Sequence, residues 1–227
     1  HNFFEMIYLL SGDSCTVKTH TASINLGKED ILILQPNTEH SIEIFQKSIV
    51  VSFLIHQNYF SSMYNSILKE KNIISSFLTQ GLYNENDKSC LLFHTLGDND
   101  IKHLLETILV ENIIDSQYSN LMIEALLLAI INFILRNHID KVEYGDSLNE
   151  LPQTISEIIL YIQNNIKDIS LNSVAENFNY TPTYLSRLIK NKAKCTFSEI
   201  LRNERIQIAC NLLKNTNMSI ENIAFEV

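Results

Sequence analysis

The sequence has few of the residues that mark fibrous, linker-rich or disulfide-stabilised proteins. Its 227 residues include five Gly, three Pro and no Trp, which excludes collagen-like and low-complexity structure. The cysteines form no CxxC pair and have no His partner at a metal-ligand spacing; they are Cys15, Cys90, Cys195 and Cys210. We therefore expect reduced thiols, no metal or other cofactor, and a core large enough to stabilise the protein alone.

Long apolar runs are also lacking. The longest run, residues 126–131, is followed by Asn132 and Arg136 and is too short to span a bilayer. We expect a cytoplasmic protein with no membrane contact. The first residue is His1, already within a strand-like pattern, so we also expect a fragment of a longer product.

Charge is distributed unevenly along the chain. Residues 1–150 hold 9 basic and 19 acidic residues, whereas residues 151–227 hold 8 and 7. Positions 187, 190, 192, 194, 202 and 205 are all basic, with only Glu199 and Glu204 as acidic residues among them. On a protein of net charge −9, this local excess predicts a confined nucleic-acid contact, although a solvated helix face gives the same count.

Two architectures follow one another along the chain. Turn residues divide the first part into six β-like runs, residues 3–10, 15–20, 23–26, 31–34, 41–45 and 49–55, which predict an antiparallel sandwich or barrel. From residue 59 the apolar period is helical, as in the stripe Ile101, Leu105 and Ile108. Residues 121–135 are apolar nearly all round, which indicates burial in their own domain or against a partner chain. The fold class is therefore α+β.

The last part of the chain predicts a helix-turn-helix. Ser170 caps a short helix, and a break at residues 179–181 leads to Pro182 at the first position of the next helix, where its missing N–H costs nothing. Capping boxes at residues 154–157 and 196–199 predict two further helices, the second running to about Lys214.

The cap-and-apolar pattern at the first of these short helices repeats 49 residues later. Ser170, Leu171, Val174, Ala175 and Phe178 correspond to Ser219, Ile220, Ile223, Ala224 and Val227. Val227 matches the last residue before the turn of the first unit. We therefore expect a second helix-turn-helix that begins at Ser219 and is incomplete in this chain.

These residues resemble a known family. Residues 171–190, followed by Phe197, Arg202, Ala209 and residues 220–224, resemble the DNA-binding domain of AraC/XylS-type transcription regulators. Residues 1–12 and 30–40 resemble the cupin-like sensor domain found in many members. The resemblance implies an antiparallel, cupin-like β-barrel with helices, followed by an all-α DNA-binding domain.

The expected domains follow from the pattern and the resemblance together. Residues 1–98 form the sensor with a helical extension, 99–143 a helical dimerisation region, and 144–152 a linker. Residues 153–227 form the DNA-binding domain, with its first helix-turn-helix at about 170–191 and a connecting helix at 196–214.

Carried over by position, the resemblance implies base contacts by Thr183, Ser186 and Arg187 on the exposed face of the reading helix. Leu185, Leu188 and Ile189 would face the core. Backbone contacts would come from Ser170, Lys190 and Lys192. The alternatives are that Arg187 is solvated or pairs with Glu176, and that Tyr184 packs on the domain rather than touching a phosphate.

The sensor half offers a small set of candidate residues, His1, Glu5, Ile7 and His40, on strands whose odd positions point to one face. We interpret it as the lining of an effector pocket. The alternatives are a divalent metal site, for which the family's leading His is not in this chain, and simple structural roles.

The predicted function is sequence-specific, DNA-binding transcription regulation without enzymatic activity, with activation as the mode that the resemblance implies. The expected partners are double-stranded DNA, a second copy of the chain, RNA polymerase and a small-molecule effector. The alternative is a metal-dependent cupin enzyme acting on a small molecule, which predicts stoichiometric metal and loss of activity in His40→Ala.

Overall fold

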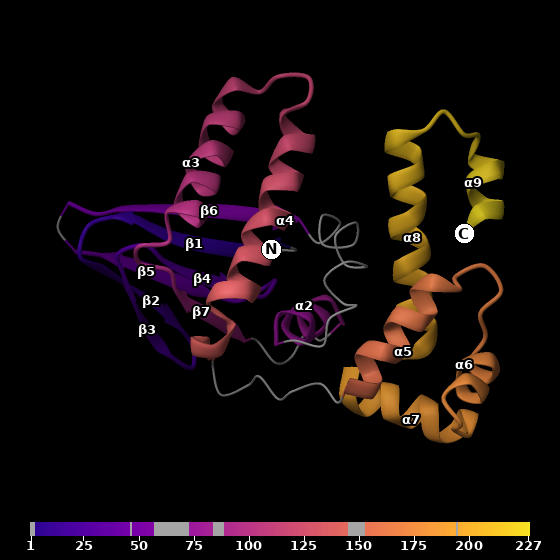
Figure 1. The fold of residues 1–227 in the computed structure, drawn as a ribbon. Helices are drawn as coiled ribbons and strands as arrows, with labels where there is room; N and C mark the ends of the chain where they lie inside the picture. Colours follow the sequence, from indigo (N-terminus) through magenta and orange to yellow (C-terminus); the bar gives the residue numbers. More distant parts are fainter. Residues whose placement is uncertain (1–2, 46, 57–72, 84–88, 145–152, 194) are drawn as a thin grey trace. The chain divides into compact units, whose positions relative to one another are not determined.

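The fold is that of a computed structural model of the chain (Figure 1). The structure describes residues 3–45, 47–56, 73–83, 89–144, 153–193 and 195–227. The chain divides into two compact units: His1–Met63 with Lys88–Leu148, and Tyr64–Asp87 with Asn149–Val227. The β-rich part and the predicted helix-turn-helix therefore belong to separate units.

Two antiparallel sheets form the first unit. The larger has the order β6-β1-β4-β7-β8, with β1 at Phe3–Ser11, β4 at Asp30–Leu34, β6 at Ile49–His56, β7 at Cys90–His94 and β8 at Glu143–Tyr144. The smaller has the order β3-β2-β5, with β2 at Ser14–Thr19, β3 at Ser23–Gly27 and β5 at His40–Ile44. The six predicted strands are confirmed within a residue or two, and β7 and β8 are additional.

The predicted barrel is not closed. Among the described residues, no hydrogen-bonded strand pair joins the smaller sheet to the larger one. Between β4 and β5 the chain passes through Pro36, which has no N–H to donate, and Asn37, whose φ of 60° is left-handed. This turn carries the chain from one sheet to the other, so the two strands do not pair. The observed architecture is two facing antiparallel sheets followed by helices.

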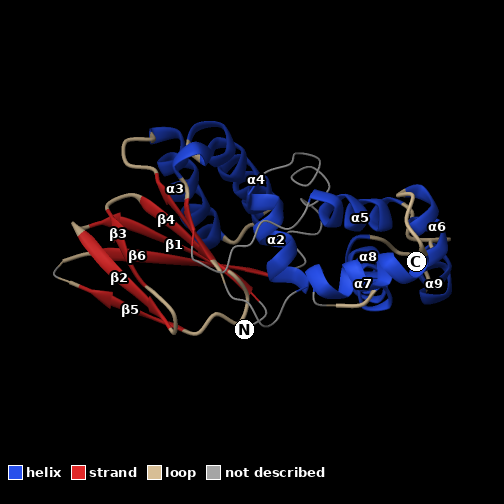
Figure 2. Ribbon diagram, turned by 90° about the horizontal axis from the view of Figure 1, so that it is seen from below, coloured by secondary structure: helices blue, strands red, loops and turns tan. Residues whose placement is uncertain are grey.

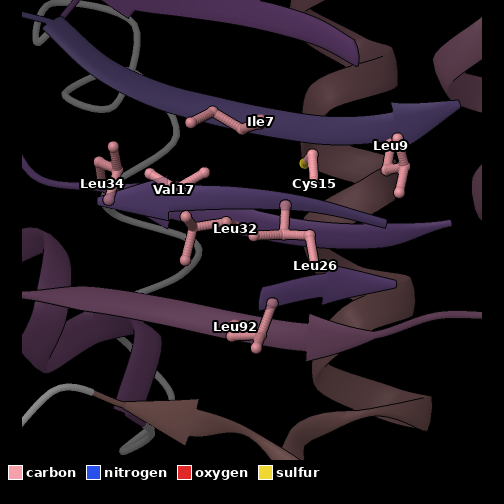
Figure 3. Packing of buried hydrophobic residues seen from close by; sticks show 8 residues of the cluster. All are labelled: Ile7, Leu9, Cys15, Val17, Leu26, Leu32, Leu34 and Leu92. Atoms are coloured by element: carbon pink, nitrogen blue, oxygen red, sulfur yellow. The ribbon is translucent and has the colours of Figure 1, made fainter. Parts of the chain in front are cut away.

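A single apolar cluster fills the space between the sheets (Figure 3). The larger sheet supplies Ile7, Leu9, Leu32, Leu34 and Leu92, and the smaller one Cys15, Val17 and Leu26. Because side chains alternate along a strand, the intervening residues of β1 and β4 point to the other face of the larger sheet. They are buried as well, for example Phe4, Met6 and Ile31.

Helices cover that second face. Figure 2 shows α3 (Asn99–Ile114) and α4 (Ser119–Asn137) over the larger sheet, and a 3-10 turn, η1 (Ile139–Lys141), leads on to β8. By length and composition α4 could cross a membrane, and it is longer than the apolar run 126–131 noted above. In this unit α4 buries Leu127, Ile130, Ile131 and Ile134, while only 28% of its apolar window is buried in all.

A buried carboxylate joins the β3–β4 turn to the start of α3. Glu29 Oε2 accepts from the backbone N–H of Gly97 (3.0 Å) and Oε1 from Nζ of Lys102 (3.1 Å), while the hydroxyl of Thr95 donates to the Glu29 carbonyl. The Gly97 hydrogen bond is the main reason that the pKa of Glu29 lies below its usual range. Burial acts in the opposite direction, and Lys102 adds to the lowering.

A second carboxylate joins the two helices. Asp98 caps α3, since its Oδ1 accepts from the N–H of Ile101 (3.1 Å). Its Oδ2 accepts from Nε2 of His138 (2.8 Å), the C-cap residue of α4, and from Nδ2 of Asn137 (3.2 Å). Burial favours the neutral acid, but these hydrogen bonds outweigh it and keep the pKa of Asp98 below its usual range.

One histidine bridges the central strands to β8. His94 Nδ1 lies 3.0 Å from the carboxylate oxygens of Asp30, and its Nε2 lies 3.3 Å from Oε1 of Glu143. Burial tends to lower the pKa of His94. The two carboxylates outweigh burial and raise it above its ordinary value.

The described part of the second unit is helical. Its helices are α2 (Ile73–Tyr83), α5 (Gln153–Asn164), α6 (Leu171–Asn177), α7 (Pro182–Ala193), α8 (Phe197–Asn215) and α9 (Ile220–Glu226). Their apolar stripes meet in a core that includes Ile158, Ile162, Val174, Leu185 and Ile223. α2 is grouped with this unit and buries Ile74, Phe77 and Leu78.

Local capping sets where these helices begin. Ser170 and Ser173 form a capping box at α6, Thr196 and Glu199 form another at α8, and Ser219 caps α9 by accepting from Asn222 N (3.2 Å). The linker expected at 144–152 lies almost wholly outside the described residues. The expected domain limits therefore remain predictions.

Candidate functional site

The turn between α6 and α7 is short and well defined. Asn179 adopts a φ of 55°, in the left-handed region that Asn tolerates better than most residues, and Tyr180 N donates to the Ala175 carbonyl (2.8 Å). α7 begins at Pro182, and the Thr181 hydroxyl accepts from Tyr184 N (3.2 Å). The predicted helix-turn-helix geometry is thus present, with α7 in the place of the reading helix.

α7 has one buried and one exposed face. Leu185 and Ile189 are fully buried and Leu188 is half-buried, as the sequence predicted. The residues predicted to contact DNA on this helix are all exposed: Thr183, Ser186, Arg187, Lys190 and Lys192. Their exposure meets the first requirement for contact with DNA, while the contacts themselves remain predictions.

Arg187 and Tyr184 differ in what surrounds them. Within the described part of the chain Arg187 forms no ion pair, so the alternative of a bond to Glu176 has no support from the contacts observed. Tyr184 is 52% exposed and lies against Tyr180, with ring centroids 5.0 Å apart. The ring of Tyr184 therefore packs on the turn, and its contact with a phosphate remains a prediction.

The other basic residues do not all belong to this surface. Arg202 is exposed, and Lys194 lies outside the described residues. Arg205 points inward, and its Nη2 donates to the carbonyls of Ile166 (3.1 Å) and Lys167 (3.2 Å). From the sequence Arg205 was predicted to belong to the basic face, because no local pattern indicates that its guanidinium donates to the distant carbonyls of Ile166 and Lys167.

Ser170 has a structural task. Its hydroxyl accepts from the backbone N–H of Ser173 (3.1 Å), and its own N–H donates to the Ser173 hydroxyl (3.0 Å). Ser170 remains exposed at the start of α6. A contact with the DNA backbone is therefore sterically open to it and remains a prediction.

A separate pocket lies at one end of the two facing sheets. Its volume is about 690 Å³, and its lining includes Glu5, Leu34, Thr38, His40 and Leu54. Oε2 of Glu5 lies 3.3 Å from Nε2 of His40, and both side chains are mostly buried. His40 Nδ1 lies 3.0 Å from the carbonyl of Thr38, which fixes the ring between two acceptors.

The predicted pocket set is only partly brought together. Glu5 and His40 meet, but Ile7 is fully buried in the cluster between the sheets and is not among the lining residues. His1 lies outside the described residues. Gln35, Asn37 and Thr38 also line the pocket, from the loop between β4 and β5, and were not predicted from the sequence.

Nothing in the described residues gathers the ligands that the enzyme alternative needs. In this part of the chain, which excludes His1, no three His, Cys, Asp or Glu side chains come together as a metal site requires.

Burial raises the pKa of the Cys195 thiol to about 11, with Glu199 adding to the effect, so it stays protonated near neutral pH.

Comparison with known proteins finds a family match within the second unit. Residues 174–227 match the family described as helix-turn-helix domain. The whole chain is 26% identical over 230 aligned residues to the uncharacterized HTH-type transcriptional regulator YfiF of Bacillus subtilis (strain 168), covering 70% of that protein. It is 28% identical over 197 residues to the HTH-type transcriptional activator RhaS of Mannheimia succiniciproducens, covering 86% of this chain and 67% of that protein.

Among solved structures, ToxT from Vibrio cholerae is similar to the chain at 16% sequence identity and a TM-score of 0.39. The similarity covers 99% of this chain and 80% of that one. Both sequence relatives are named as helix-turn-helix transcription regulators.

Proposed function

We propose that this chain, which belongs to the AraC type of helix-turn-helix transcription regulators, reads its DNA sites with the exposed face of α7. In this proposal Arg187 donates two hydrogen bonds to a guanine, and Thr183 and Ser186 contact neighbouring base edges. Lys190, Lys192 and Ser170 contact phosphates, which supply affinity without sequence information.

One observation carries this assignment. The predicted base-contacting residues stand on the solvent side of a helix whose other side, Leu185 and Ile189, is fully buried. The core therefore fixes the helix while its exposed face stays free to enter a groove. A reading helix needs both properties, because sequence discrimination depends on a rigidly placed donor set.

The test compares two substitutions on this face. Arg187→Ala should weaken binding to a selected site by about 1–3 kcal/mol and relax one base position, because it removes a base contact. Lys190→Ala should weaken binding to selected and random DNA alike. Selection from a genomic fragment library at two salt concentrations supplies the sites. Equal losses on selected and random DNA for Arg187→Ala would contradict the assignment of base contact.

We further propose that α9 is the first helix of a second helix-turn-helix, joined to the first by α8. Two features support this: Ser219 caps α9 as Ser170 caps α6, and Ile223 is buried where Val174 is buried in α6. In such a pair both helix-turn-helix motifs face one side of the DNA and contact successive major grooves.

The pocket beside Glu5 and His40 is our proposed effector site, in a unit that we take to be cupin-like. The paired polar side chains of Glu5 and His40, together with apolar walls, suit a small polar molecule better than a purely apolar one. A thermal-shift screen of small metabolites should find a stabilising compound whose effect is lost in Glu5→Gln and His40→Gln. A compound that stabilises all three proteins equally would bind elsewhere.

Dimerisation through the helical region is the remaining proposal. The end of the α3–α4 hairpin exposes six large apolar side chains: Val110, Ile113, Ile114, Tyr118, Leu121 and Met122. Ile113 is 82% exposed. Apolar surface gathered in this way is typical of an interface. Sedimentation should show a dimer that Ile113→Asp dissociates and that Leu96→Asp, at an exposed apolar residue outside the two helices, does not. A monomer at tens of micromolar would contradict it.

For the regulator as a whole, we propose activation through contact with RNA polymerase, in the cytoplasm and without catalysis. RhaS, which matches most of this chain, is named an activator. Transcription in vitro from a promoter carrying the selected site tests the sign: added protein should raise the transcript, and a decrease would make the chain a repressor.

A further inference from the structure

The loop between α5 and α6 receives contacts from two other helices of the second unit. From α8, the Nη2 atom of Arg205 donates to the carbonyls of Ile166 (3.1 Å) and Lys167 (3.2 Å). From α9, the carboxylate of Glu226 lies 2.7 Å from Nζ of Lys167. The same Lys167 nitrogen lies 5.8 Å from the centroid of the Phe225 ring. One short segment is thus bound by α8 and by α9.

The Arg205 contact is the stronger of the two. Its side chain is half-buried, and within the described residues its Nε is buried without a hydrogen-bond partner. A guanidinium in that position depends on the two carbonyls, because releasing them would leave a partly desolvated charge without acceptors. Both side chains of the Lys167–Glu226 pair are about half-exposed, so the pair contributes little stability. It mainly favours one orientation of α9 relative to the loop.

These contacts fix a degree of freedom that α8 leaves open. α8 has 19 residues and is therefore about 28 Å long, which sets a distance between its two ends. A helix by itself does not set how the elements at its ends are rotated about its axis. The bound loop leads directly into Ser170, the cap of α6, so holding it to α8 and α9 sets that rotation.

We propose that Arg205 is a positioning residue for DNA binding, which orients α9 relative to α7 and so sets the spacing of the two DNA segments that this unit contacts. The Lys167–Glu226 pair supports the same orientation. Arg205 itself does not touch DNA in this arrangement. The inference rests on the proposed DNA-binding function and adds to it the residue that aligns the two halves.

Hydroxyl-radical footprinting of the chain on a selected DNA site tests the proposal. The reading helix α7 and α9, the first helix of the proposed second helix-turn-helix, should protect two backbone segments about 10 base pairs apart. The variant is Arg205→Gln, which removes the guanidinium and keeps a polar side chain. Its matched control is Arg202→Gln, which removes the same charge from an exposed position on the same helix.

The expected result separates orientation from charge. In Arg205→Gln the α7 segment should stay protected, with affinity for DNA carrying only that segment within about threefold of the parent chain. Protection of the second segment should fall by about fivefold or spread over neighbouring positions. In Arg202→Gln the two segments should keep their spacing and sharpness. Arg205→Lys should restore part of the second footprint, because an ammonium also donates to carbonyls.

A charge exchange provides the second variant, which does not disturb Arg205. Lys167→Glu alone should broaden the second segment, and Lys167→Glu combined with Glu226→Lys should sharpen it again. Two sharp segments at the parental spacing in Arg205→Gln would overturn the proposal. So would an equal loss of both segments, since Arg205 would then contact DNA or hold the whole unit together. If the parent chain protects no DNA, the proposed function fails instead, and that result is distinct from both.

Discussion

Each of the two units of this protein is stabilised internally by a different kind of polar contact. In the first unit the decisive hydrogen bonds join residues far apart in sequence, as Glu29 joins Lys102 and Asp98 joins His138. Among the described residues of the second unit, most of the side-chain hydrogen bonds link residues three positions apart, as at Ser170 and Thr196. A unit built from local caps can be recognised in the sequence itself, whereas a unit fastened by distant partners cannot.

The largest expected effect is in the first unit. Glu29→Ala should lower its free energy of unfolding by about 3 kcal/mol, because Lys102 and the Gly97 N–H lose their buried acceptor. Urea unfolding followed by tyrosine fluorescence measures it. Glu39→Ala, which breaks an exposed pair with His20, is the control and should change stability by less than about 0.5 kcal/mol. Equal losses of stability in the two variants would contradict the stabilising role of the buried Glu29 carboxylate.

Asn179 in the second unit should show a smaller but clear effect. Asn179→Val should cost about 2 kcal/mol, because a β-branched residue is strained at a φ of 55°. Asn179→Gly should be neutral within about 0.5 kcal/mol, since glycine adopts this conformation freely. Unfolding followed by circular dichroism at 222 nm measures both. If the valine variant were as stable as the glycine variant, the turn would tolerate another backbone conformation.

Loss of one cap should have a smaller effect still. Thr196→Ala should cost about 1 kcal/mol, because the first turn of α8 loses the acceptor of the Glu199 N–H. Hydrogen exchange should show that the loss is confined to the start of α8. Ser198→Ala, two residues later on the exposed side of the same turn, should be neutral or slightly stabilising. Faster exchange throughout the second unit would mean that its contacts are less local than proposed.

The smallest effect concerns β8 and its dependence on pH. Because the folded state raises the pKa of His94, its contribution is complete below the unfolded value of 6.5 and is lost as pH rises through the folded pKa. Exchange protection of Leu91 and Leu92, corrected for intrinsic rates, should therefore fall slightly between pH 5.5 and 8. His94→Gln should abolish this dependence and His20→Gln should not. A profile unchanged in His94→Gln would assign the effect to another group.

The strands show what local patterns can and cannot predict. Six were predictable because alternating side chains between turn residues leave a clear signal. β7 was missed because residues 90–94 form a short apolar run that also fits a buried helix, and β8 has only two residues. Closure of the barrel was predicted and is wrong, since pairing between sheet edges depends on how the Pro36–Asn37 turn directs the chain.

The candidate sites follow the same rule. The exposed face of α7 was predicted from the family resemblance, and the burial of Leu185 and Ile189 opposite the exposed Arg187 agrees with it. Ile7 does not line the pocket that Glu5 and His40 share. It shares a face with Glu5, but only Glu5 lies near the open end of the sheets, and position along a strand relative to a distant loop leaves no mark in the sequence. Arg205 was missed for the same reason, since its two acceptors are backbone carbonyls.

The attachment of β8 also has a mechanical consequence. β8 pairs with β7 through only two residue pairs, and it is the last described element before residues 145–152. Tension applied to the chain beyond Tyr144 would peel these pairs one after another, at low force. The peeling would stop at His138, where the end of α4 is tied to Asp98. The first unit can thus release β8 and η1 under load while α3, α4 and the other strands stay folded.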